Sequence, residues 1–483
     1  MTTEKEGNWW KRPCGGRDVL KLALPLVIST ASWSVMNFCD RMFLLWHSTR
    51  EMAAAMPAGM LYFTILCFPL GIVLYVNTFV AQYKGAGQPE KIGLAVWHGV
   101  RVALFAFPLF LATIPLAPIF FRLIGHDPEV AALEVVYYQI LAFGAGGHLV
   151  ATALSTFFTG RGETRTVMLV SVSASLLNIV LDYAWIFGRF GFPELGIEGA
   201  AWATVVSLWY RGFAYVWLMM RPINREKYHL LSGRRFDAAL FRRLLRYGGP
   251  NGLQLVVEMA AFAVFILLVG RLGEHAMAAT TLAFNVNALA FVPLLGMGVA
   301  VSTMVGQQLG RNRPDMAAQA TWTSLGMAMT YMGIMAALYL LVPTWFLIGH
   351  ASGVSPEEFA GLRDTAVVLL RFVAAYCLFD ALSIIFASAI KGAGDTHFIL
   401  WTNLLFAPLP VAGAWLGITY FGCGLIWCWW MLTAWVCVLG LIYLARFLQG
   451  RWRNMRVIEP RPTVDGEAKL DETRAVPDVE RII

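Results

Sequence analysis

Charged side chains are scarce in this sequence of 483 residues. Asp, Glu, Lys and Arg together make up 14% of it, while 58% of the residues are hydrophobic. A soluble globular domain has about 25% charged residues, because its surface must interact with water. Most of this chain is therefore expected to lie in lipid. The net charge of +7 is spread over short segments between long apolar runs, which argues against nucleic acid as a partner.

Several chemical motifs are also missing. No GxxxxGK[ST] phosphate-binding loop occurs, which argues against an ATP-driven pump, and no HExxH zinc motif occurs among the eight histidines. The seven cysteines form no CxxC pair, and most of them lie in apolar runs. No set of nucleophile, base or metal ligands can be assembled from residue spacing. We therefore expect neither a cofactor nor a catalytic site, and a membrane-embedded enzyme is only a distant alternative.

Long apolar runs dominate the rest of the sequence. A membrane-spanning helix needs about 20 apolar residues. Twelve segments meet this length, which predicts an all-α polytopic membrane protein with transmembrane helices at 20–44, 57–82, 94–120, 131–157, 166–188, 197–220, 246–270, 279–305, 317–346, 365–389, 398–420 and 424–447.

Loop charge predicts the orientation of these helices. With the N-terminus in the cytoplasm, the inside loops carry most of the Lys and Arg residues, so both termini are expected to be cytoplasmic. The longest loop is basic and divides the chain. The expected organisation is a cytoplasmic N-terminal segment at 1–17, a six-helix bundle at 18–220, a basic linker at 221–245, a second six-helix bundle at 246–447, and a charged, disordered cytoplasmic tail at 448–483.

The two halves repeat one another. At one constant offset, five residues of the first half recur in the second: Pro25, Gln82, Gly85, Pro89 and Ala95 correspond to Pro250, Gln307, Gly310, Pro314 and Ala320. The stretch Gly160-Arg-Gly162-Glu-Thr164 is likewise echoed by Gly392-Ala-Gly394-Asp-Thr396. Each half has an even number of spans, so the repeat is parallel, and such repeats place the substrate between the halves.

Six motifs together resemble the MATE (multidrug and toxic compound extrusion) family, in its NorM-like branch, over residues 18–447. They are Asn37-Phe-Cys-Asp40, Phe79-Val-Ala-Gln82-Tyr-Lys-Gly85-Ala-Gly87, Leu177-Asn178-Ile-Val-Leu-Asp182-Tyr183, Gly196-Ile-Glu-Gly199-Ala-Ala-Trp-Ala-Thr204, Gly249-Pro250 and Val305-Gly306-Gln307-Gln308-Leu-Gly310. The resemblance implies a monomeric efflux transporter of the plasma (inner) membrane. Such a transporter exports organic cations or drugs by antiport with Na⁺ or H⁺, alternating access between two bundles.

Acidic residues inside the predicted spans indicate functional sites, because a carboxylate in the bilayer is costly unless it is paired, hydrated or neutralised. Asp40 and Asp182 lie at similar depths near the outer ends of their spans, and Asn178 is one turn from Asp182 on the same helix face. Thr204 could add a hydroxyl. These four residues are the expected cation-coupling site of the first bundle. The alternative for Asp40 is a structural pair with Arg41, which departs from the family pattern.

The second half offers its own acidic set. Glu258 lies midway along its span, and Tyr376 precedes Asp380 by one helical turn. The resemblance implies that Glu258, Tyr376 and Asp380 form a second cation-coupling site. Oxygen ligands suit Na⁺ and carboxylates also suit H⁺, so the residue types leave the ion open.

Aromatic residues on inner helix faces are candidates for contacts with flat organic cations, and Trp33 and Phe262 are the two we single out. Arg211, inside a predicted span, either reaches the cytoplasmic side or pairs with an acid. A flippase for lipids or lipid-linked oligosaccharides is the nearest alternative function. It would need a cavity rich in Arg and Lys, whereas this chain places acids in mid-membrane.

Overall fold

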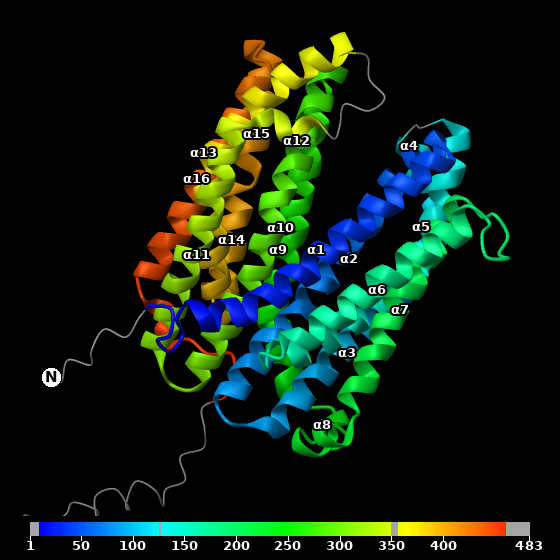
Figure 1. Ribbon diagram of the computed structural model, residues 1–483. Helices are drawn as coiled ribbons and strands as arrows, with labels where there is room; N and C mark the ends of the chain where they lie inside the picture. Colours follow the sequence, from blue (N-terminus) through cyan, green and yellow to red (C-terminus); the bar gives the residue numbers. More distant parts are fainter. Residues whose placement is uncertain (1–8, 125–126, 349–355, 460–483) are drawn as a thin grey trace, which may run out of the picture.

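The computed structural model describes residues 9–124, 127–348 and 356–459 (Figure 1). These residues form helices and their connections and no β-strand. The first half contains α1 (Gly16–His47), α2 (Thr49–Gly85), α3 (Pro89–Thr113), the 3-10 turn η1 (Ile114–Leu116), α4 (Ala117–Ile124), α5 (Pro128–Thr159), α6 (Thr164–Ile186) and α7 (Ile197–Met219).

The linker contains two short elements, α8 (Pro222–Lys227) and the 3-10 turn η2 (Ser232–Arg234). The second half then contains α9 (Ala238–Gly270), α10 (Glu274–Gly310), α11 (Pro314–Leu341), α12 (Pro343–Ile348), α13 (Pro356–Ala393), α14 (Thr396–Phe406), α15 (Pro408–Phe421), α16 (Leu425–Leu448) and the 3-10 turn η3 (Arg451–Asn454). We call α1–α7 the first bundle and α9–α16 the second bundle.

Eleven helical segments of the described chain are long and apolar enough to cross a membrane. They agree with the predicted spans, with α3 and α4 forming one segment and α14 and α15 another. The predicted span at 197–220 corresponds to α7, which is not among the eleven although it is as long as α6, at 23 residues. Its Trp and Tyr side chains and Arg211 lower its mean hydropathy, yet α7 packs against α5 and α6 inside the first bundle.

The two bundles meet at one end of the molecule and diverge towards the other (Figure 1). The joined end carries α8 and the turns at 86–88 and 311–313, and the diverging end carries α4 and α12. Helices α1 and α2 of the first bundle pack against α10 and α9 of the second, and α2 also packs against α10. These four helices make the most extensive contacts between the bundles.

Glycines allow the backbones to touch at this interface. A Cβ atom on Gly85 would lie 2.1 Å from the Gln307 carbonyl oxygen, and one on Gly310 would lie 2.2 Å from the Gln82 carbonyl oxygen. The contacts are reciprocal, because Gln82 and Gly85 are the repeat partners of Gln307 and Gly310. A second close approach joins α2 and α9, where a Cβ on Gly71 would lie 2.4 Å from Gly252 Cα.

The repeated glutamines add hydrogen bonds across the same interface. Gln82 donates to the Gly392 carbonyl of the second bundle at 3.0 Å, and Gln307 donates to the Gly160 carbonyl of the first bundle at 2.8 Å. Gly160 and Gly392 are themselves a repeat pair. Residues that suggested a duplication in the sequence therefore hold the two halves together.

The predicted boundaries need two corrections. Helix α9 begins at Ala238, inside the expected linker 221–245, because Asp237 caps it by accepting from the Leu240 main-chain N–H at 2.9 Å. The expected disordered tail, 448–483, is also wrong in its first part: residues 449–459 pack on the joined end, with Trp452 and Val457 buried. The rest of the expected tail, 460–483, and residues 1–8 of the expected N-terminal segment, 1–17, lie outside the described residues.

A methyl group at the bundle interface should destabilise the fold. We expect Gly85→Ala to lower the free energy of unfolding by about 1–3 kcal/mol, because its Cβ would overlap the backbone of α10. The matched control is Gly326→Ala in α11, where a Cβ meets no atom within 4 Å. It should stabilise the helix by about 0.5–1 kcal/mol. Thermal unfolding of both variants in detergent tests the difference, and equal melting temperatures would contradict it.

Candidate functional site

Asp40 of α1 is buried in the first bundle, with 9% of its surface exposed. The Tyr137 hydroxyl of α5 is its hydrogen-bonding neighbour, and its Oδ1 atom has no hydrogen-bond partner. Arg41 is exposed and forms no ion pair with Asp40 at contact distance among the described residues. The alternative of a structural Asp40–Arg41 pair is therefore not favoured by the geometry.

Asp182 and Asn178 lie one turn apart on α6, and both are fully buried. With its amide oriented to satisfy both neighbours, Asn178 donates to Asp182 Oδ2 at 2.9 Å and accepts from the Thr204 main-chain N–H at 3.2 Å. Thr204 thus joins the site through its backbone rather than through the hydroxyl expected from the sequence. The second carboxylate atom, Asp182 Oδ1, is buried without a partner.

The two carboxylates are close enough to interact electrostatically with one another, and both interact with Tyr137. Neither forms an ion pair with Lys or Arg within the part of the chain that the structure describes. The first-bundle cluster therefore comprises Asp40, Tyr137, Asn178, Asp182 and the Thr204 backbone. Two adjacent carboxylates with unpartnered oxygens have the chemistry to hold a proton or a hard metal cation such as Na⁺.

Sequence reasoning missed Tyr137. Tyrosine is common in membrane helices, and its polar neighbours on α5, Glu134 and Gln139, were a local signal that could have pointed to it. Only the tertiary arrangement of α1, α5 and α6 brings its hydroxyl to the acids. An ion held here would have oxygen ligands from the two carboxylates and the phenol, which suits a hard cation.

In the second bundle, Glu258 of α9 is half-buried and accepts a hydrogen bond from Gln254 Nε2 at 2.6 Å. Its other electrostatic neighbours are Lys391 of α13 and Tyr443 of α16. A basic residue therefore lies near Glu258 in space although none is near it in sequence. In the first-bundle cluster, Arg41 is the corresponding basic neighbour, because its charge acts electrostatically on Asp40.

Tyr376 and Asp380 are both buried on α13, one turn apart, and interact electrostatically. The neighbours of Asp380 include Cys377 and Cys437. Neither residue forms a hydrogen bond or ion pair with Glu258 among the described contacts. The structure therefore brings together the expected first-bundle set more completely than the expected second-bundle set of Glu258, Tyr376 and Asp380.

Of the two aromatic candidates, Trp33 lies against polar residues and Phe262 against other aromatic rings. The Trp33 ring is 5.6 Å from the His148 ring, and the Arg211 guanidinium is 5.7 Å from the Trp33 ring centre. Arg211 thus points into the first bundle and has no carboxylate partner within the described residues. The Phe262 ring, 40% exposed as a residue, lies 5.3 Å from the Phe284 ring, which stacks on Trp429.

Known proteins resemble this chain in sequence over most of its length. A family model described as MatE matches residues 25–184 and 250–416 of this chain. The multidrug resistance protein NorM of Burkholderia vietnamiensis is 29% identical over 437 residues, covering 89% of this chain and 93% of that protein. The multidrug resistance protein PmpM of Pseudomonas aeruginosa is 29% identical over 409 residues, covering 83% of this chain and 84% of that protein.

Solved structures show the same fold. An outward-facing multidrug resistance MATE family transporter of the MOP superfamily superposes with a TM-score of 0.82 at 20% identity, covering 94% of this chain and 100% of that chain. A MOP superfamily transporter from Pyrococcus furiosus superposes with a TM-score of 0.80 at 22% identity, covering 91% of this chain and 95% of that chain. The matched relatives are named as transporters and not as enzymes. The chain is accordingly a multi-pass membrane protein that belongs to the MATE family of multidrug efflux transporters.

Proposed function

We propose that this transporter is a secondary antiporter that exports organic cations in exchange for Na⁺ or H⁺ bound at the first-bundle cluster. The observation that carries the proposal is the pair of buried, unpartnered carboxylate oxygens, Asp40 Oδ1 and Asp182 Oδ1, in one membrane-embedded bundle. A buried acid without a basic partner is costly unless a proton or cation neutralises it. Loading and release of that cation would change the charge of the cluster.

Alternating access follows as the means of coupling. The bundles are joined at one end and apart at the other (Figure 1). An exchange cycle would pass through the opposite arrangement, with cation and cargo preferring different states. The proposed orientation has both termini in the cytoplasm of the plasma (inner) membrane, which makes the joined end the cytoplasmic one. The excess of Lys and Arg in loops at that end supports this orientation. We further propose that the transporter works as a monomer.

A lipid or lipid-linked oligosaccharide flippase remains the alternative function. Such a protein would need several basic residues converging on an anionic headgroup. In the described first bundle Asp40 and Asp182 are buried electrostatic neighbours, which favours a cationic cargo, although Arg211 also points into that bundle. Trp33 is the proposed contact for the flat part of that cargo in the first bundle, and Phe262 in the second.

Neutralising the first-bundle acids should uncouple export. We expect Asp182→Asn, and separately Asp40→Asn, to reduce gradient-driven export of a fluorescent organic cation from proteoliposomes by about tenfold or more, because neither variant retains a two-carboxylate site. Na⁺ and pH gradients are imposed in separate experiments, so a response to only one of them names the ion. The matched control is Asp364→Asn, an exposed acid paired with Arg363, which should export normally. Normal export by both cluster variants would refute the proposal and make flippase assays with lipid-linked cargo the next step.

The second-bundle acids should matter less. Glu258 has a basic neighbour in Lys391, and Asp380 has no second carboxylate beside it. We therefore expect Glu258→Gln and Asp380→Asn to retain more gradient-driven export than Asp182→Asn in the same assay. The reverse ranking would move the coupling site to the second bundle, with Glu258, Tyr376 and Asp380 as its residues.

A further inference from the structure

The segment that follows α16, residues 449–459, packs against the two bundles. Its first part is fixed to the second bundle, where Trp452 is 2% exposed and stacks on Phe447 of α16 with ring centres 4.7 Å apart. Arg453 also pairs with Asp315 at the start of α11, at 3.2 Å. Up to this point the segment contacts only the bundle from which it emerges.

The next residues cross to the first bundle. Val457 is 1% exposed and Ile458 7% exposed, and both pack into an apolar core that contains Tyr83 and Ile92 of the first bundle and Leu240 of α9. The Val457 main-chain N–H donates to Gln82 Oε1 at 2.9 Å. Gln82 is the same residue that donates to the Gly392 carbonyl of the second bundle. The segment therefore covers one of the hydrogen bonds that join the two bundles.

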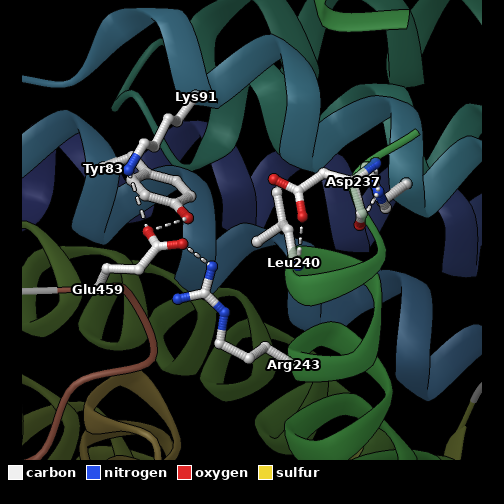
Figure 2. A network of polar contacts seen from close by, with 7 residues as sticks. Tyr83, Lys91, Asp237, Leu240, Arg243 and Glu459 are labelled. Carbon is white, nitrogen blue, oxygen red and sulfur yellow. Dashed lines mark hydrogen bonds and ion pairs between the residues drawn. The ribbon is translucent and has the colours of Figure 1, made fainter. Parts of the chain in front are cut away.

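Glu459 ends the described segment and bridges both bundles (Figure 2). From the first bundle it accepts hydrogen bonds from Lys91 of α3 at 3.1 Å and from the Tyr83 hydroxyl of α2 at 3.3 Å. From the second bundle it is paired with Arg243 of α9. Burial by itself raises the pKa of Glu459, but the hydrogen bonds from Arg243 and Lys91 outweigh that effect and lower it, so the carboxylate is charged at neutral pH.

We propose that residues 452–459 form a latch that clamps the joined end of the transporter and has to detach from the first bundle before that end can open. Opening the joined end would draw α2 and α3 away from α9. The latch is fixed to α16 at one end and to α2 and α3 at the other, so it cannot keep both attachments during that motion. Its apolar contacts and its charge-assisted hydrogen bonds thus stabilise the conformation in which the bundles diverge at the opposite end.

The proposal rests on the alternating-access motion proposed above, and a readout at the far end of the molecule tests it. Spin labels at Arg189→Cys, after α6, and Phe421→Cys, at the end of α15, report the separation of the bundles at the diverging end, in the full chain with native cysteines replaced. Both side chains are exposed. Pulsed electron–electron double resonance in lipid nanodiscs measures the distance between the two labels and gives the ratio of the short-distance to the long-distance population. We expect Glu459→Lys to raise that ratio about tenfold, because it replaces attraction to Arg243 and Lys91 by repulsion.

Two further variants test whether the shift comes from the bridge between the bundles and not from any change in the tail. Asp315→Asn breaks the tail's ion pair within its own bundle and should leave the distance ratio unchanged. Combining Glu459→Lys with Arg243→Glu restores a charge pair of opposite polarity and should return the ratio towards that of the parent protein. An unchanged ratio in Glu459→Lys, or an equal shift in Asp315→Asn, would overturn the latch. The measurement needs neither cargo nor gradient, so its failure is distinct from a failure of the proposed antiport.

Discussion

The backbone contact between the bundles at the joined end is the constraint on which the rest of the structure depends. Gly85 and Gly310 each lie against the carbonyl of the repeated glutamine in the other half, where no side chain could fit. A second backbone contact, between Gly71 of α2 and Gly252 of α9, lies farther along the same interface. The bundles meet at the joined end and diverge towards the other (Figure 1), and the tail crosses between them where they meet.

The two halves share this architecture but differ in their charge chemistry. In the first bundle, Asp40 and Asp182 are electrostatic neighbours, and each has one carboxylate oxygen without a hydrogen-bond partner. In the second, Glu258 has Lys391 as an electrostatic neighbour and Asp380 stands on another helix. A duplicated fold can therefore keep its packing residues in both halves, because both halves form the interface, while its buried acids are arranged differently in each half.

Much of the fold was predictable from the sequence, and less of the site. Apolar runs located the long helices, and the sparse repeat around Gln82 and Gln307 marked the interface, because hydrophobic length and backbone approach are local demands on residue type. Asn178 and Asp182 were predictable as a pair because one helical turn separates them. Tyr137 and Lys391 were not, since each approaches its acid from a helix distant in the chain. The tail was expected to be disordered because its composition is polar, yet Val457 and Ile458 find a core that only the assembled bundles provide.

The sequence by itself determined that this chain is an all-α membrane protein of the MATE family, because lipid imposes a length and composition on every spanning helix and the family motifs recur together in order and spacing. Tertiary structure decided which acids meet, which of them lack a cationic partner, and that the segment ending at Glu459 joins α3 to α9. These outcomes depend on helix packing across long sequence distances, where no local pattern records which side chains will face one another.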